Sequence, residues 1–189
     1  MTTGGIRDRF RAQMRQEVKQ AALRQLAEGG PGALSINAIG KELGVSGPAL
    51  YRYFAGRDAL LTELVLDAYA DLTAALSAAA RRLPDLAAAY RSWATAHPHR
   101  YRLLFGTPAP GADPDDERHG DAVRRLLTLL LPRGEPAPDP GPAVTVRAVS
   151  VWGRLHGFVS LEIEGNFRAL GLDPDRLFAA EVDALRSAR

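Results

Sequence analysis

The chain has 189 residues, 46 % of them apolar and 24 % charged, the composition of a globular protein with one or two small domains. It contains no cysteine, which excludes disulfide bonds and thiol catalysis and makes a reducing cytoplasm the expected compartment. The formal net charge of +2 divides into +4 over residues 1–60 and −2 over the remainder. A basic N-terminal part favours a polyanionic partner, although a surplus of a few charges also arises by chance.

Neither a signal peptide nor a membrane span is expected. Residues 1–10 are polar and charged, without the apolar stretch of a secretory signal. The longest uncharged, mostly apolar run, residues 72–80, is far shorter than the roughly 20 residues that span a bilayer. We therefore expect a cytoplasmic protein with no membrane partner.

The apolar residues recur at helical spacing and strand signals are scarce, so the sequence predicts an all-α fold of about nine helices. Two proline-rich stretches, 106–115 and 132–142, are expected to be surface loops. The predicted helices span 11–28, 35–43, 46–53, 57–82, 85–96, 98–105, 116–131, 143–164 and 173–186.

Local signals set the boundaries of the first helices. The run Gly29–Gly32, which includes a proline, ends the first helix, and Ser35 is a good N-cap for the next. Gly44 stands where a sharp turn between helices needs a positive φ angle. Ser46 can cap the following helix, and Pro48 lies in its first turn, where a missing N–H costs nothing.

Residues 35–54 have the pattern of a helix-turn-helix. Ile39 and Leu43 on one helix and Leu50 on the next would bury against each other, with Val45 filling the turn. This packing sets two helices at a steep angle, so that the second can enter a DNA major groove about 12 Å wide. The pattern alone is also compatible with ordinary core residues and surface tyrosines.

The surrounding residues resemble the N-terminal domain of the TetR (tetracycline repressor-like) family. The resemblance covers about residues 12–72 and is most specific over 44–61. The matching positions are Ala22, Leu23, Glu28, Gly30, Leu34, Ser35, Ile39, Gly44, Val45, Ser46, Leu50, Tyr51, Tyr53, Phe54, Arg57, Asp58, Leu60 and Leu61.

The resemblance implies a role for each part of the motif. Ser35 and Tyr51 would hydrogen-bond phosphates, Tyr53 and Arg57 would touch the backbone, and the small residues 46–49 would face bases. The candidate DNA-contacting residues are Ser35, Asn37, Ser46, Gly47, Pro48, Ala49, Tyr51, Arg52, Tyr53 and Arg57.

Two positions depart from the family pattern. Gly40 stands where alanine is usual; it costs about 1 kcal/mol of helix propensity, in exchange for a closer helix contact. The first half of the recognition helix also lacks long polar side chains. Ala49 can meet a thymine methyl and Arg52 a guanine, while DNA shape would carry much of the discrimination.

The predicted organisation is a three-helix DNA-binding domain, 12–72, followed by a helical ligand-binding and dimerisation domain, 80–189. One helix-turn-helix offers about four phosphate contacts, so a homodimer on a palindromic operator is needed for tight binding.

The helix 143–164 is apolar on two faces and is expected to be buried on both, one against its own core and one against a partner subunit. The last helix would complete an intersubunit bundle, as the resemblance also implies. The two stripes are Val144, Ala148, Val151, Leu155 and Phe158, and Trp152, His156, Val159 and Ile163; the last helix carries Phe178, Val182 and Leu185.

Trp152, His156-Gly157 and the segment 97–105 resemble a TetR-family C-terminal subtype with a Trp/His-Gly signature. We expect a largely apolar pocket for a small-molecule effector, although each aromatic residue also fits an ordinary core. The candidate pocket residues are Trp93, Tyr101, Leu104, Phe105, Trp152 and His156.

Other classes of function fit less well. No glycine-rich phosphate loop or nucleophile motif is present, so no enzyme and no cofactor are expected. His97 and His99 are two residues apart across a proline, unlike helical i, i+4 metal ligands, and the acidic residues 113–116 near His119 are more typical of a solvated loop. An architectural DNA-binding protein without a ligand remains an alternative.

As a mechanism, we expect an effector to shift the long helix 57–82, which joins the two domains, and so to change the spacing of the recognition helices of a repressor dimer. Such a ligand must prefer one spacing, with a typical coupling of about 1–3 kcal/mol.

Overall fold

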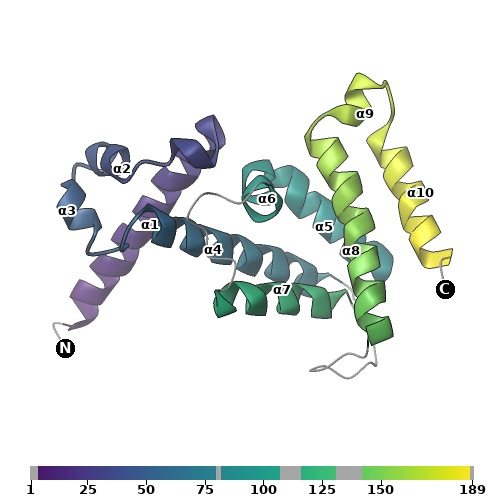
Figure 1. The fold of residues 1–189 in the computed structure, drawn as a ribbon, viewed down its shortest axis with the longest axis horizontal. Helices are drawn as coiled ribbons and strands as arrows, with labels where there is room; N and C mark the ends of the chain where they lie inside the picture. Colours follow the sequence, from purple (N-terminus) through teal and green to yellow (C-terminus); the bar gives the residue numbers. More distant parts are fainter. Residues whose placement is uncertain (1–3, 80–81, 107–115, 131–141, 188–189) are drawn as a thin grey trace. The chain divides into compact units, whose positions relative to one another are not determined.

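The computed structural model describes residues 4–79, 82–106, 116–130 and 142–187. Within these ranges the regular structure is ten α-helices and one 3-10 helix, with no strand, which confirms the all-α prediction (Figure 1). None of the described helices is both long enough and apolar enough to cross a membrane. The helices are α1 (Gly4–Gly29), η1 (Pro31–Ala33), α2 (Ile36–Glu42), α3 (Gly47–Leu50), α4 (Arg57–Ala78), α5 (Leu83–Ala96), α6 (Pro98–Phe105), α7 (Glu117–Leu129), α8 (Pro142–Ile163), α9 (Asn166–Ala169) and α10 (Pro174–Ser187).

The described residues form two compact units. The first contains 4–68 and 99–106, and the second contains 69–79, 82–98, 116–130 and 142–187. Helix α4 begins in the first unit and ends in the second. The domain limits expected from the sequence, 12–72 and 80–189, stay a prediction.

The first unit is built on a core shared by α1, α2, α3 and the first half of α4. Apolar residues at four-residue spacing on α1 face this core: Val18, Ala22 and Leu26 are buried, and Met14 packs against them. The fully or almost fully buried residues of this core are Val18, Ala21, Ala22, Leu26, Leu34, Ile36, Ile39, Leu50, Phe54, Leu60, Leu61 and Leu64.

The turn between α2 and α3 depends on two glycines. Gly44 has φ +68°, the left-handed conformation predicted for it. The N–H of Val45 donates to the carbonyl of Gly40 at 2.9 Å. A Cβ on Gly40 would lie 2.8 Å from the Val45 oxygen and 3.4 Å from Cδ1 of Leu50. The structure therefore confirms that glycine at position 40 permits a close helix contact.

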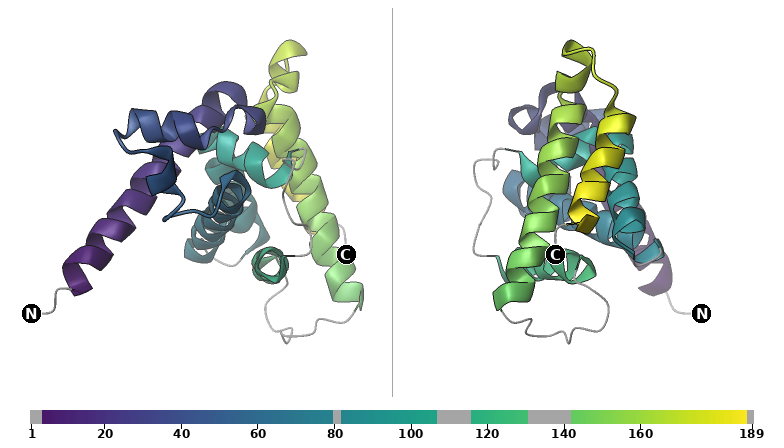
Figure 2. Two further views of the ribbon diagram at one scale, coloured as in Figure 1. Left: turned by 60° about the vertical axis from the view of Figure 1, so that its left-hand side comes forward. Right: turned by 90° about the vertical axis from the view of Figure 1, so that its right-hand side faces the viewer.

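The second unit is a bundle in which α5 packs against α8, α10 contacts both, and α7 packs against α8. Helices α8 and α10 run side by side in Figure 2. Arg91 on α5 joins all three helices: it pairs with Glu162 at 2.6 Å and Asp175 at 2.7 Å, and lies 4.8 Å from the ring centroid of Phe178. The hydrogen bond to Glu162 is the main cause of the raised pKa of Arg91.

Two α-helical segments were not predicted. Helix α1 begins at Gly4 rather than Arg11. Ile6 and Phe10 continue the four-residue apolar spacing of the later turns, a signal that the sequence analysis missed, although both side chains are exposed. Helix α9 follows Gly165, whose φ of +77° reverses the chain after α8. Four residues are too few for a periodic signal.

Gly40→Ala should lower the free energy of unfolding by about 1 kcal/mol. Overpacking against backbone costs roughly 1–3 kcal/mol, while alanine contributes about 1 kcal/mol of helix propensity. Urea unfolding followed by circular dichroism measures the difference. Gly120→Ala on α7 is the matched control, since its new Cβ would meet only the tip of Arg124 at 3.4 Å; it should be neutral or stabilising. Equal stabilisation by both substitutions would contradict the close contact.

Candidate nucleic-acid interface

The recognition segment is shorter as an α-helix than predicted. The sequence predicts a helix over 46–53, whereas α3 ends at Leu50 and a turn follows over 51–53. In that turn Arg52 N donates to Ala49 O at 3.2 Å and Tyr53 N to Leu50 O at 2.9 Å, both i→i−3 bonds. Ser46 occupies the N-cap position without a side-chain capping bond, and Pro48 lies in the first turn.

One face of the recognition segment packs on the core, and the other face is open to solvent. Leu50 is 1 % exposed and Phe54 4 %, so both are core residues, while Tyr51 is 56 % exposed. The candidate DNA-contacting residues that are exposed are Asn37, Ser46, Pro48, Tyr51 and Arg52; those that are half-buried are Ser35, Gly47, Ala49, Tyr53 and Arg57.

Ser35 and Arg57 both have structural roles beside the predicted ones. Ser35 Oγ accepts from Ala38 N at 3.3 Å, which confirms the predicted N-cap. Its backbone N–H donates to Gln25 Oε1 at 2.9 Å. Arg57 Nε donates to the Leu34 carbonyl at 3.3 Å, which fixes the segment before α2 to the start of α4. Their phosphate contacts stay predictions.

Ionic contacts from α1 hold this arrangement and were missed by sequence reasoning. Lys19 is only 7 % exposed and lies 2.8 Å from Asp67 Oδ2 and 3.3 Å from Glu63 Oε2. Arg15 pairs with the same Glu63 at 3.1 Å and also donates to the Tyr53 carbonyl. The signal available was the i, i+4 spacing of two cations on one helix and two carboxylates on another.

Arg15 also stacks on the core of the motif, since its guanidinium carbon lies 4.3 Å from the ring centroid of Phe54. One α1 side chain therefore contacts α4, the end of the recognition segment and the aromatic residue after it.

The candidate effector residues are divided between the two units. Trp93 and Tyr101 are buried, and the other four are half-buried. Burial lowers the pKa of His156, which favours the neutral imidazole. In the first unit Tyr101 lies edge-on to Phe105, with ring centroids 5.0 Å apart. Tyr101, Leu104 and Phe105 belong to the first unit, and Trp93, Trp152 and His156 to the second.

The acidic stretch near His119 is partly outside the described residues, which include neither Asp113 nor Asp115. Asp116 accepts from Arg118 N as the N-cap of α7, and its pKa is lowered chiefly by the hydrogen bond from the Arg118 side chain. Across the described ranges, no group of three or more histidine and acidic residues is placed to hold a metal ion.

The short helix α3 follows a tight turn, packs on a core formed with α1, α2 and α4, and has small residues on its exposed face. This arrangement defines a helix-turn-helix DNA-binding protein, here with a second helical unit. The chain belongs to the TetR family of transcriptional regulators. Residues 20–64 match the family described as bacterial regulatory proteins, tetR family, and residues 83–185 match a tetracyclin repressor-like C-terminal domain.

Known proteins resemble this chain in sequence or fold over nearly its whole length. The HTH-type transcriptional regulator Rv1816 of Mycobacterium tuberculosis is 31 % identical over 96 % of this chain and 94 % of its own length. A crystal structure of SCO4313, described as a regulatory protein, is 42 % identical, with TM-score 0.82 over 94 % of this chain and 97 % of its own. FadR of Bacillus subtilis, solved in complex with stearoyl-CoA, shares the fold at 16 % identity, with TM-score 0.67 over 92 % of this chain and 98 % of its own.

Proposed function

We propose that the chain is a homodimeric repressor that binds a palindromic operator and is released from it by a small-molecule effector. The observation that carries the proposal is the exposed face of residues 46–52, which is supported from behind by the buried Leu50. Small side chains at the start of α3 allow the backbone to approach base edges. Tyr51 and Arg52 supply donors suited to phosphates or guanine, and Ala49 suits a thymine methyl.

Dimerisation is supported by an apolar face on α8. Val146, Val149 and Leu161 are 65 %, 43 % and 48 % exposed, and a Cβ added at Gly153 or Gly157 would meet nothing within 4 Å. At helical spacing these five residues form one continuous stripe on which a second copy of the chain can pack closely.

This stripe differs from the one expected from the sequence. Leu155 and Val159, one from each of the two stripes expected from the sequence, are both completely buried within the subunit. Phe178, Val182 and Leu185 of α10 are also buried in the subunit's own core rather than left for an intersubunit bundle. The intramolecular packing of α5 and α10 on α8 occupies those faces. We therefore assign the interface to the opposite side of α8, with the exposed side of α10 beside it.

An effector site is supported by aromatic residues in the second unit. Trp93 on α5 and the half-buried Trp152 and His156 on α8 lie on two helices that pack together. FadR, with the same fold, is solved with stearoyl-CoA, whose long acyl chain is apolar like the effector proposed for this chain. The Trp/His-Gly subtype and the contributions of Tyr101, Leu104 and Phe105 belong to this proposal. Effector binding would act on DNA affinity through α4.

Removal of one hydroxyl tests the DNA interface. Duplexes selected from a random library by the full-length protein should share a two-fold symmetric site. Tyr51→Phe should weaken binding to the selected duplex by at least about tenfold, because a hydrogen bond to a charged group contributes roughly 1.5–3 kcal/mol. Fluorescence anisotropy measures the affinity, and an unchanged unfolding curve shows that the exposed hydroxyl does not support the fold. Selection of asymmetric sites, or unchanged affinity, would contradict the proposal.

A charge on the α8 stripe should separate the subunits. Val149→Glu would bury a carboxylate in the interface and shift the protein from dimer to monomer, with loss of tight operator binding. Sedimentation velocity measures the change in mass. Leu170→Glu is the matched control: Leu170 is 71 % exposed at the end of α9, outside the stripe. The proposed interface is wrong if the parent chain is monomeric or if Val149→Glu remains dimeric.

The two tryptophans report on the effector site. We expect that at least one of 1-decanol, 1-naphthol and tetraphenylphosphonium, which are apolar, aromatic and cationic probes, quenches fluorescence saturably. Trp93→Phe and Trp152→Phe assign the signal. The same probe should lower operator affinity by about 5- to 150-fold, the usual range of allosteric coupling. Absence of quenching by every probe would favour an architectural protein without a ligand, and quenching without an effect on DNA binding would contradict release by the bound probe.

A further inference from the structure

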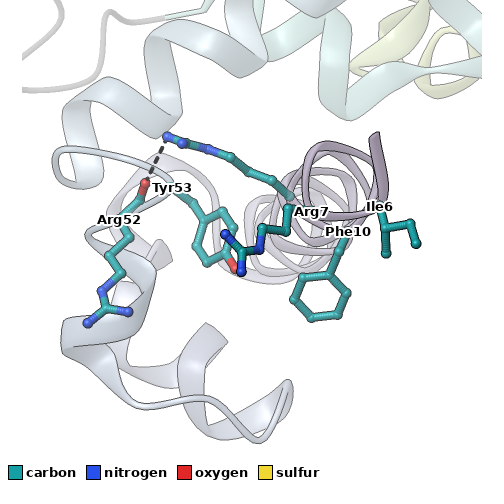
Figure 3. A pocket seen from close by; sticks show the side chains of 6 residues that line it. Ile6, Arg7, Phe10, Arg52 and Tyr53 are labelled. Atoms are coloured by element: carbon teal, nitrogen blue, oxygen red, sulfur yellow. Dashed lines mark hydrogen bonds between the residues drawn. The ribbon is translucent and has the colours of Figure 1, made fainter. Parts of the chain in front are cut away.

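The first turns of α1 and the end of the recognition segment line an open hollow of about 430 Å³ (Figure 3). Its lining combines three cationic and three apolar or aromatic side chains. They are Ile6, Arg7, Phe10, Arg11, Arg52 and Tyr53. Because Arg52 directly follows the exposed Tyr51, the hollow continues the surface proposed to face DNA.

The three arginines of the hollow have no carboxylate partner within the described ranges. Arg11 uses Nη2 to donate to the Arg52 carbonyl at 3.3 Å, which ties α1 to the segment after α3 but neutralises no charge. Elsewhere in this unit, Arg15 and Arg24 are paired with Glu63 and Glu42. The hollow therefore concentrates uncompensated positive charge.

The apolar part of the hollow is also uncovered. Ile6 is 67 % exposed and Phe10 is 59 % exposed, both on the part of α1 that extends beyond the predicted start of the helix. Exposed apolar side chains beside unpaired cations match a partner that alternates negative charge with apolar groups.

We propose that this hollow binds the sugar–phosphate backbone of the DNA that flanks each operator half-site. Arg7, Arg11 and Arg52 would contact phosphates, and Phe10 would pack against deoxyribose. This inference rests on the proposed DNA-binding function and adds a contact outside the helix-turn-helix. It explains why α1 extends to Gly4 with side chains that the subunit's own core does not use.

The test compares two duplexes and three variants of the full-length protein. One duplex carries only the selected palindrome, and the other extends it by about six base pairs on each side, roughly half a helical turn. Affinities are measured by anisotropy between about 50 and 200 mM salt. Arg7→Gln removes one unpaired cation, and Phe10→Ala removes the apolar wall.

Arg9→Gln is the matched control. It makes the same change of charge on the same helix, but Arg9 does not line the hollow and its Nε donates to the Gly5 carbonyl of its own helix at 2.9 Å. All three residues are exposed, so their substitution should leave the unfolding curve unchanged.

On the extended duplex, Arg7→Gln should make the slope of log K against log salt less negative by about 0.9 for each bound subunit. Phe10→Ala should weaken binding by the same factor at every salt concentration, since it removes no charge. On the short duplex both variants should bind like the parent, and Arg9→Gln should keep the parent slope on both.

Equal slopes for Arg7→Gln and Arg9→Gln would overturn the site, as would an effect that persists on the short duplex. Either result leaves the proposed repressor function intact, because the parent still binds its operator. If the parent selects no duplex at all, the proposed function and the flanking site fail together. Dependence on the flanks separates DNA backbone from a free anionic amphiphile, whose binding would not depend on duplex length.

Discussion

The close approach of the Val45 carbonyl to the α-carbon of Gly40 is the contact on which the DNA-binding unit depends. With no side chain at Gly40, α2 and the turn after it can come together within hydrogen-bonding distance, and Val45 N–H closes the turn on the Gly40 carbonyl. This turn directs Leu50 into the core, where it is 1 % exposed. Because one face of α3 packs on the core, the other face and the following Tyr51 are open to solvent and available to the proposed DNA partner.

The recognition segment is too short a helix to be stable by itself, and side chains of α1 fix its position. Helix α3 has only four residues, and Arg11 and Arg15 donate to the carbonyls of Arg52 and Tyr53 that follow it. Arg15 is held in turn by Glu63 on α4, which it shares with Lys19. A displacement of Glu63 would therefore act on the end of the recognition segment through one shared ion pair. The proposed coupling through α4 can therefore reach the recognition segment through the contact between Glu63 and Arg15.

The features that follow from local chemistry could be predicted from the sequence. The N-cap Ser35 and the left-handed Gly44 lie as expected, because each depends on the residue's own backbone preferences. The features that depend on distant residues could not. The early end of α3 is stabilised by arginines about 40 positions away, and the exposed stripe of α8 is defined by which of its faces α5 and α10 cover. Periodicity marked α8 as apolar on two sides without indicating which side remains open.

The net positive charge of residues 1–60 is unevenly distributed, because some of the cations form ion pairs and others do not. Several cations of the first unit are matched by nearby carboxylates and contribute little field at a distance. Three cations that no described carboxylate matches, Arg7, Arg11 and Arg52, gather around one hollow beside the small residues that begin α3. In the proposed DNA complex, most of the charge and most of the sequence reading would thus fall to different residues. Arginines that contact phosphates set how tightly the protein binds at a given salt concentration, whereas the shape of the uncharged α3 face selects among sequences. A face without long polar side chains is therefore compatible with specific binding, provided that the flanking arginines fix its position on the duplex.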